Sequence, residues 1–201
     1  EARDADHILN EARRQWDAGA VYLDVNTAMM RTTEAEAMAW VIELIQDDLP
    51  DALIAIDSAN PVAVEAGLKV HKGRPLLNSI NAEKQRIDDL IPLIREYNPR
   101  VIGLTIDDEG ISQEADKRYQ LGAELIELLS KNDIALDDIF IDPLIFPVSA
   151  ELQAGNTSLA IISRLNNDYP DVHTVCGLSN ISFGLPERRL INQVYMVLAM
   201  G

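Results

Sequence analysis

The sequence predicts an α/β fold of the (β/α)8 TIM-barrel type, and three observations lead to this expectation. Short apolar runs alternate with helix-length segments along the 201 residues, no two runs follow one another directly, and nearly every run ends on a polar residue. Such alternation is typical of parallel strands joined by right-handed crossovers. Parallel strands bring their carboxyl ends to one rim, where the chemistry of these folds is found.

Six apolar runs are the candidate strands. They cover residues 20–26, 52–57, 75–78, 101–105, 139–142 and 172–180. A segment long enough for a helix follows each run, and the steps between strand ends are long enough for crossovers. We therefore expect a first helix over residues 5–16 and then about six strand–helix units.

The helical segments carry their own signals. Apolar residues recur at the spacing of one-sided burial, for example over 87–94. Thr33 and Glu36 have the spacing of a capping box, and Asn60 before Pro61 predicts a cap with proline at the first helical position.

The choice between a barrel and an open doubly wound sheet depends on the loops after the strands. A doubly wound sheet would usually show a glycine-rich phosphate loop after its first strand, whereas the glycines here are isolated. A barrel brings all strand ends to one mouth, which agrees with the polar rim. Because a full barrel needs about 250 residues, we expect one domain over 1–201, an incomplete barrel whose first and eighth strands lie outside this chain.

Composition excludes several classes of partner. The chain has 33 acidic and 17 basic residues, a net charge of −16, which argues against nucleic acid. It has no signal-peptide pattern and no apolar stretch of the roughly 18 residues that a membrane span needs. The single Cys176 excludes a disulfide framework and suggests a cytoplasmic protein. The three histidines lack metal-ligand spacing, so we expect no metal site.

Two aspartates and an asparagine on the rim point to a hydrogen-bonding heterocycle. Asp57 and Asp142 each close an apolar run, so their carboxylates are partly desolvated and need donors. A ring N–H beside an exocyclic amine offers two parallel donors to one carboxylate, and Asn78 adds an amide that donates and accepts. This set suits a 2-amino-4-oxo-pyrimidine such as a pterin. The alternative is that each aspartate caps the next helix.

The stretch 177–182 is the second candidate segment. A glycine followed by small polar residues forms a loop that can pass close to a ligand, and Asn180 can donate without carrying charge. An ordinary surface loop is the alternative.

Six segments together resemble a known family, the methyltetrahydrofolate:corrinoid methyltransferases. These are pterin-binding barrels, related to the folate module of cobalamin-dependent methionine synthase. The matching segments are 23–26, 57–60, 77–83, 102–105, 141–144 and 177–182. They occur in order between Trp16 and about Asn192, so the resemblance implies a single pterin-binding barrel domain over 1–201.

The resemblance also implies an activity and roles for residues. The activity is methyl transfer between N5 of methyltetrahydrofolate and the cobalt of cobalamin carried by a corrinoid protein, in an undetermined direction, by a homodimer. Asp57, Asn78 and Asp142 would hold the pterin, and Asn180 would reach N5 as the catalytic residue. Arg188 resembles an arginine near the substrate. The two remaining positions are Asn26, a further rim candidate for binding the substrate, and Phe183, which is polar in some members of the family.

Two alternatives stay open at this point. The related dihydropteroate synthases share the pterin pocket, but they carry a glycine-rich loop after the Asp-Pro pair and a late Ser-Arg-Lys-like segment, which this sequence lacks. The other alternative is a non-catalytic module that binds folate or docks a corrinoid protein.

Overall fold

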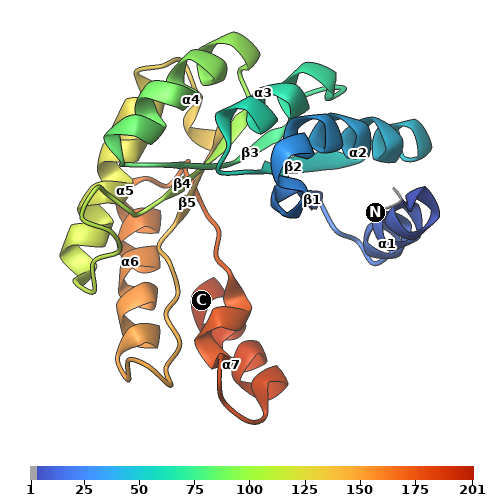
Figure 1. The fold of residues 1–201 in the computed structure, drawn as a ribbon. Coiled ribbons are helices and arrows are strands. Elements are labelled where there is room, and N and C mark those ends of the chain that lie inside the picture. Colours follow the sequence, from blue (N-terminus) through green and yellow to red (C-terminus); the bar gives the residue numbers. More distant parts are fainter. Residues whose placement is uncertain (1–3) are drawn as a thin grey trace. The chain divides into compact units, whose positions relative to one another are not determined.

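A computed structural model describes residues 4–201, in which six parallel strands alternate with helices (Figure 1). The strands are β1 Tyr22–Asn26, β2 Leu53–Asp57, β3 Leu76–Asn81, β4 Arg100–Leu104, β5 Ile139–Asp142 and β6 His173–Thr174. The helices are α1 Ala5–Asp17, α2 Glu34–Asp48, α3 Pro61–Val70, α4 Lys84–Tyr97, α5 Ala115–Ser130, α6 Ala154–Asp168 and α7 Arg188–Met200. Three short 3-10 helices are η1 Ala28–Thr33, η2 Leu136–Asp138 and η3 Leu178–Ser182.

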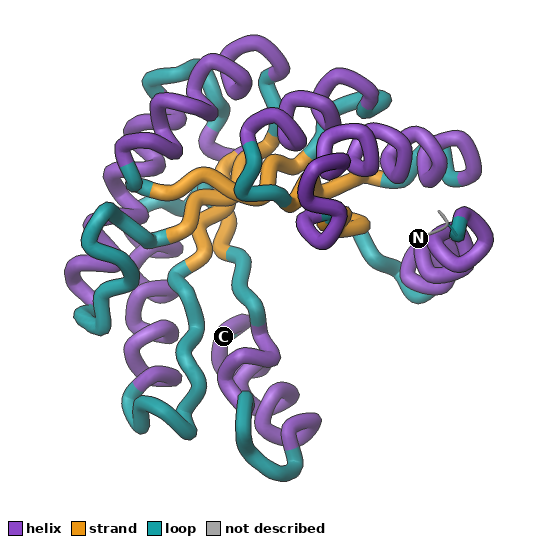
Figure 2. The backbone as a smooth tube through the Cα atoms, viewed as in Figure 1, coloured by secondary structure: helices purple, strands orange, loops and turns teal. Residues whose placement is uncertain are grey.

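The strands lie in the sheet in chain order, from β1 to β6, as the barrel expectation requires. The chain divides into two compact units, residues 1–80 with 88–101, and residues 81–87 with 102–201. Strand β4 begins in the first unit and ends in the second. Figure 2 shows the regular alternation of strand, loop and helix along the chain.

In the first unit the register of three strands places predicted rim residues beside one another. Asn26 at the end of β1 is the partner of Asp57 at the end of β2, and Asp57 is the partner of Asn78 on β3. Helices α2 and α3 pack against each other and against β1 and β2 (Figure 1). The core between them is made of fully buried aliphatic side chains such as Ile42 and Ile56.

In the second unit β5 pairs with β6, and β4 ends beside β5. The backbone N–H of Thr105 donates to the Asp142 carbonyl at 3.3 Å. Helices α5 and α6 pack on each other, and α7 packs on η3. A cluster of Ile145, Ile181 and Tyr195 fixes this last contact.

Most of the predicted elements are confirmed, and two strands differ in length. Strand β3 continues to Asn81, so Asn78 lies inside the strand and not at its end. Strand β6 is only His173–Thr174, and the residues after it form a loop and η3. The expectation of a strand over 172–180 was therefore wrong, because Gly177 and the polar residues after it favour a tight turn over an extended ladder.

The two predicted caps had different outcomes. Asn60 caps α3 as expected, since its side chain accepts from the Val62 N–H at 3.1 Å and Pro61 follows it. The capping box at Thr33 was wrong, because the Thr33 hydroxyl bonds to the Met30 carbonyl and makes no cap bond.

Candidate functional site

Four polar side chains of the first unit form two hydrogen-bonded pairs on β1, β2 and β3. Asn26 Nδ2 donates to Asp57 Oδ2 at 2.8 Å, and Asn78 Nδ2 donates to Asp24 Oδ2 at 2.9 Å. Leu23 and Val25 alternate with Asp24 and Asn26 along β1 and are buried, so the polar pair faces away from α2. We call these four residues, Asp24, Asn26, Asp57 and Asn78, the β1–β3 cluster.

Asn26 is fixed at both ends of its amide. Its Oδ1 accepts from the Ala28 N–H at 3.0 Å while its Nδ2 holds Asp57. The Asn26 amide therefore orients the Asp57 carboxylate. Because Asn26 holds Oδ2, a ligand at Asp57 would bind to Oδ1.

Asp24 is a member of the cluster that our sequence-based candidates did not include. Desolvation raises the pKa of its carboxyl, the hydrogen bond from Asn78 lowers it, and the negative charge of Asp57 raises it further. The strict alternation over 23–26 carried a signal for it, since Asp24 shares a face of β1 with Asn26.

The buried carboxylate of Glu34 links the start of α2 to the residues that follow β2. Glu34 is 8% exposed and accepts from the Ser58 hydroxyl and, at 3.3 Å, from Asn60 Nδ2. Asn60 in turn caps α3. This network fixes the loop that immediately follows Asp57.

Asp142 is the half-buried carboxylate of the second unit, at the end of β5. Its Oδ1 accepts from the Leu144 N–H at 2.8 Å. Desolvation raises the pKa of Asp142 to about 6, and the Leu144 hydrogen bond opposes this rise. The carboxyl is thus mostly ionised at neutral pH and neutral in mild acid.

Asn180 lies on the exposed surface of η3 and not at a strand end as its position suggested. A Cβ atom at Gly177 would come within 2.9 Å of Asn180 Nδ2, so the absence of a side chain at 177 makes room for the amide. The next residue of η3, Ile181, is buried in the cluster with Tyr195. The amide is therefore presented from an anchored turn.

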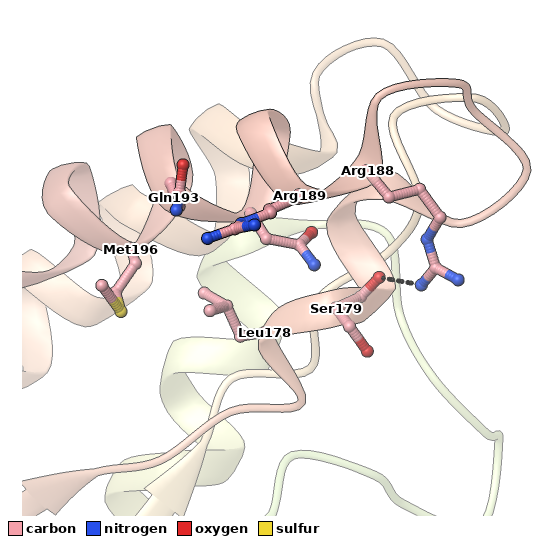
Figure 3. A pocket seen from close by; sticks show the side chains of 7 residues that line it. Leu178, Ser179, Arg188, Arg189, Gln193 and Met196 are labelled. Carbon is pink, nitrogen blue, oxygen red and sulfur yellow. Dashed lines mark hydrogen bonds between the residues drawn. The ribbon is translucent and has the colours of Figure 1, made fainter.

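Arg188 braces the same turn. Its Nη2 donates to the Ser179 carbonyl at 2.9 Å (Figure 3). Its Nε donates to the Ser182 hydroxyl at 3.1 Å. Ser182 also donates to Asn192 Oδ1 at 2.7 Å. These bonds give Arg188 a role in holding η3, whereas its predicted contact with substrate stays a prediction.

A hollow of about 520 Å³ lies between η3 and α7 (Figure 3). Its lining consists of Leu178, Ser179, Arg188, Arg189, Asn192, Gln193 and Met196. Neither Asp142 nor Asn180 belongs to that lining, so this hollow is not the candidate site. Phe183, next to η3, is 63% exposed.

Two general features of residues 4–201 bear on partners. No group of three or more His, Cys, Asp or Glu side chains there is arranged to hold a metal ion. Within the same range, no helix combines the length and the apolar character that crossing a membrane requires.

The sequential parallel sheet, with polar residues at the ends of β1, β2 and β5, defines the class of (β/α)-barrel proteins. The chain belongs to the family described as pterin binding enzymes, which its residues 1–201 match. It is 34% identical to the methylcorrinoid:tetrahydrofolate methyltransferase of Eubacterium limosum, over all of this chain and 74% of that protein. It is 32% identical to the methionine synthase of Mycobacterium tuberculosis (strain ATCC 25618 / H37Rv), over 97% of this chain but only 17% of that protein.

Solved structures show the same fold at low identity. The dihydropteroate synthase of Xanthomonas albilineans in complex with 7,8-dihydropteroate matches with a TM-score of 0.69 and 16% identity, over 97% of this chain and 75% of that one. The enzyme of Yersinia pestis with a pterine-sulfa conjugate matches with a TM-score of 0.72 and 16% identity, over 98% and 80%. The fold class predicted from the sequence is thereby confirmed.

Proposed function

We propose that this protein transfers a methyl group between N5 of methyltetrahydrofolate and the cobalt of a corrinoid carried by a partner protein. One observation carries the proposal: the 34% identity to a methylcorrinoid:tetrahydrofolate methyltransferase extends along the whole chain. The match to methionine synthase, a larger protein, supports the same substrate class. The dihydropteroate synthases share the fold, but their identity to this chain is only 16%. Their similarity is therefore no argument that this protein catalyses the same reaction.

The proposed pterin contacts use carboxylate oxygens that the protein has already oriented. Asp57 has one oxygen held by Asn26, and Asp142 has one held by the Leu144 N–H. The remaining oxygen of each accepts from the ring N–H and amino donors of the pterin. Asn78, whose Nδ2 is engaged by Asp24, offers its Oδ1 as a further acceptor. A donor-rich heterocycle matches such a set of acceptors.

The reaction is a displacement in which the corrinoid supplies the electron pair. In the direction from folate, cob(I)alamin forms the Co–CH3 bond with that pair while the CH3–N5 bond breaks. The N5 electron pair takes up one proton, so tetrahydrofolate and methylcobalamin are the products. The reverse reaction returns the methyl group to N5 and releases the proton. The chain's own residues bind and orient the folate.

Asn180 acts on the charge that develops at N5. If N5 were not protonated, it would have to leave as an amide anion, which is a poor leaving group. N5 must therefore gain a proton or a strong hydrogen bond by the transition state. The Asn180 carbonyl accepts from protonated N5, or its Nδ2 orients the water that delivers the proton. An amide is not itself a proton source at neutral pH.

The proposal also covers assembly and location. A row of exposed apolar side chains on α7 supports a homodimer, namely Leu190, Val194, Val197 and Leu198, which are 53–68% exposed. Since two copies of a chain with net charge −16 repel each other, an uncharged face is the suitable contact. The single Cys176 agrees with a cytoplasmic location. Sedimentation analysis of the wild type beside Val194→Glu tests the dimer, and a wild-type monomer contradicts it.

Isothermal titration with methyltetrahydrofolate, followed by spectroscopy of cob(I)alamin, tests the activity itself. We expect folate binding and the appearance of methylcobalamin. Folate binding without methyl transfer to any corrinoid would indicate a binding module. Condensation of p-aminobenzoate with a pterin pyrophosphate would instead indicate a dihydropteroate synthase.

A further inference from the structure

Arg118 in the first turn of α5 is a fully buried arginine, only 1% exposed. It lies in phase with the apolar stripe that includes Leu121 and Leu125, on the side of α5 that faces the core. Its guanidinium sits 5.2 Å from the centre of the Phe146 ring. A charged group in this position carries a large desolvation cost unless its contacts compensate for it.

The hydrogen bonds of Arg118 go to backbone carbonyls next to Asp142. Its Nη1 donates to the Pro143 carbonyl at 2.8 Å and to the Leu144 carbonyl at 2.6 Å. Its Nε has no hydrogen-bond partner among the described residues. The Arg118 guanidinium therefore binds the backbone of one turn and forms no salt bridge among the described residues.

That turn is held at three successive carbonyls. Thr105 binds the Asp142 carbonyl through its N–H at 3.3 Å and its hydroxyl at 3.2 Å, and Arg118 binds the next two. Leu144 has φ +60°, a left-handed conformation that costs a non-glycine residue free energy. In this conformation the Leu144 N–H reaches Asp142 Oδ1 at 2.8 Å.

We propose that Arg118 is a positioning residue for Asp142. The Pro143 carbonyl and the Leu144 N–H belong to one planar peptide unit, so by binding that carbonyl Arg118 fixes the direction in which the N–H points to Asp142 Oδ1. By binding the Leu144 carbonyl it also holds Leu144 in its left-handed conformation. The other carboxylate oxygen is thereby kept in one orientation for the donors of the pterin. This inference rests on the pterin-binding role of Asp142 in the proposed function.

The turn also controls the ionisation of Asp142. The Leu144 N–H stabilises the carboxylate against desolvation, so losing that bond raises the pKa of Asp142 above its present value of about 6. The other titratable groups in electrostatic contact with Asp142 are the Cys176 thiol and the Tyr195 hydroxyl. Burial raises the pKa of both, so both are neutral at pH 7 and neither compensates for the lost bond.

The experiment compares Arg118→Met, Arg118→Lys and Arg164→Met with the wild type. Methionine keeps an unbranched apolar stem without donors, and lysine keeps a charge with donors. Arg164 is the matched control, because it pairs with Asp116 and stacks on Tyr119 at an exposed site. The dissociation constant of methyltetrahydrofolate is measured from pH 5 to 8.5, with a melting curve for each variant.

We expect the wild type and Arg164→Met to lose affinity as pH falls through about 6. Arg118→Met should bind more weakly at pH 7, by about twofold for a pKa shift of one unit and about tenfold for a shift of two units, with its midpoint moved to higher pH. Arg118→Lys should fall between the two. A folded Arg118→Met with unchanged affinity and midpoint overturns the inference. If Arg118→Met does not fold, the affinity and pH midpoint of Arg118→Lys are compared with those of the wild type instead, and unchanged values overturn the inference.

A direct titration separates this inference from the proposed function. The Asp142 carboxyl signal in carbon-13 NMR, assigned by its loss in Asp142→Asn, reports its pKa without any ligand. A higher midpoint in the Arg118 variants supports the positioning role even if the wild type binds no folate, which would refute only the proposed function. An unchanged carboxyl midpoint refutes the positioning role.

Discussion

Asn26 Nδ2 donates to Asp57 Oδ2 across 2.8 Å and joins the ends of two neighbouring parallel strands. The other end of the same amide is held by the Ala28 N–H. In the structure the bonds of the Asn26 side chain orient the Asp57 carboxylate. The contact with substrate that the sequence suggested for Asn26 stays a prediction.

The first prediction concerns this bond. Asn26→Ala removes the donor and frees the Asp57 carboxylate to rotate, so methyltetrahydrofolate should bind about tenfold or more weakly, the cost of one hydrogen bond to a charged group. Isothermal titration measures the effect. Asn156→Ala, which removes an exposed amide on α6 that donates to nearby Gln153, is the control. Equal affinities of Asn26→Ala and the wild type would contradict the role.

The second prediction concerns the unfolding free energy that the protein loses when Asp142 ionises. Its pKa in the folded protein, about 6, exceeds the usual unfolded value of about 3.9, so the protonated form favours folding. The stabilising contribution is complete below pH 4 and is lost as pH rises through 6. Asp142→Asn should therefore be more stable than the wild type at pH 8, by on the order of 1–3 kcal/mol.

Urea unfolding of both proteins between pH 4 and 8 measures this difference. The gap between them should close toward pH 4, because the wild-type carboxyl is then neutral as well. Methyltetrahydrofolate binding should be weaker in Asp142→Asn at every pH where the carboxylate is ionised. A constant difference in unfolding free energy across the range would show that ionisation of Asp142 does not cause it.

The third prediction uses the contact between Gly177 and Asn180. Asn180→Ala should leave folate binding nearly unchanged and slow single-turnover methyl transfer, because the amide acts as N5 becomes protonated. Gly177→Ala should have the same kinetic effect, since its Cβ would displace Asn180 Nδ2 from its present place. The displaced group is the end of a side chain, so the melting temperature should change little.

Ser179→Ala is the control for this pair, because it removes a hydroxyl from the same turn but leaves the carbonyl that Arg188 binds. It should transfer methyl groups at the wild-type rate. A normal rate in Gly177→Ala beside a slow one in Asn180→Ala would mean that the present orientation of the amide does not matter.

The fourth prediction tests the packing that supports β2. A Cβ at Gly67 would lie 3.0 Å from Ile42 Cδ1 and 3.1 Å from two atoms of Ile56. Gly67→Val should overpack the contact between α2, α3 and β2 and lower the unfolding free energy by about 1–3 kcal/mol. Glu65→Ala, which removes only an exposed ion pair with Lys69, should change it by less than about 1 kcal/mol.

Much of this architecture can be predicted from local patterns in the sequence. Asp57 and Asp142 end their strands as the apolar runs indicated, and Asn60 caps its helix. The length of β6 could not be predicted in this way. Hydrophobicity extends through Leu178, whereas the backbone leaves the strand after Thr174 because a turn bonded around Asn180 replaces the ladder.

Residues that act through other residues were the hardest to find. Asp24 lies in the middle of β1, whereas the sequence-based candidates were chosen at the ends of strands. Arg118 carried a signal, since it shares the helical spacing of Leu121 and Leu125, a face on which an arginine is unusual. Its partners, the carbonyls of Pro143 and Leu144, are backbone groups that no side-chain pattern reveals.

Methyl transfer itself is tested most simply by anaerobic mixing of the protein with methyltetrahydrofolate and cob(I)alamin, or with its corrinoid protein, followed by the absorbance of the cobalt. We expect cob(I)alamin to be converted to methylcobalamin at a rate that rises with protein concentration, and tetrahydrofolate to form in equal amount. Starting from methylcobalamin and tetrahydrofolate, methyltetrahydrofolate should form in the presence of the same protein. The Asn180→Ala variant should bind folate and react slowly in both directions. A folded wild-type protein that binds methyltetrahydrofolate but exchanges no methyl group with any corrinoid, in either direction, would contradict the proposed methyltransferase function.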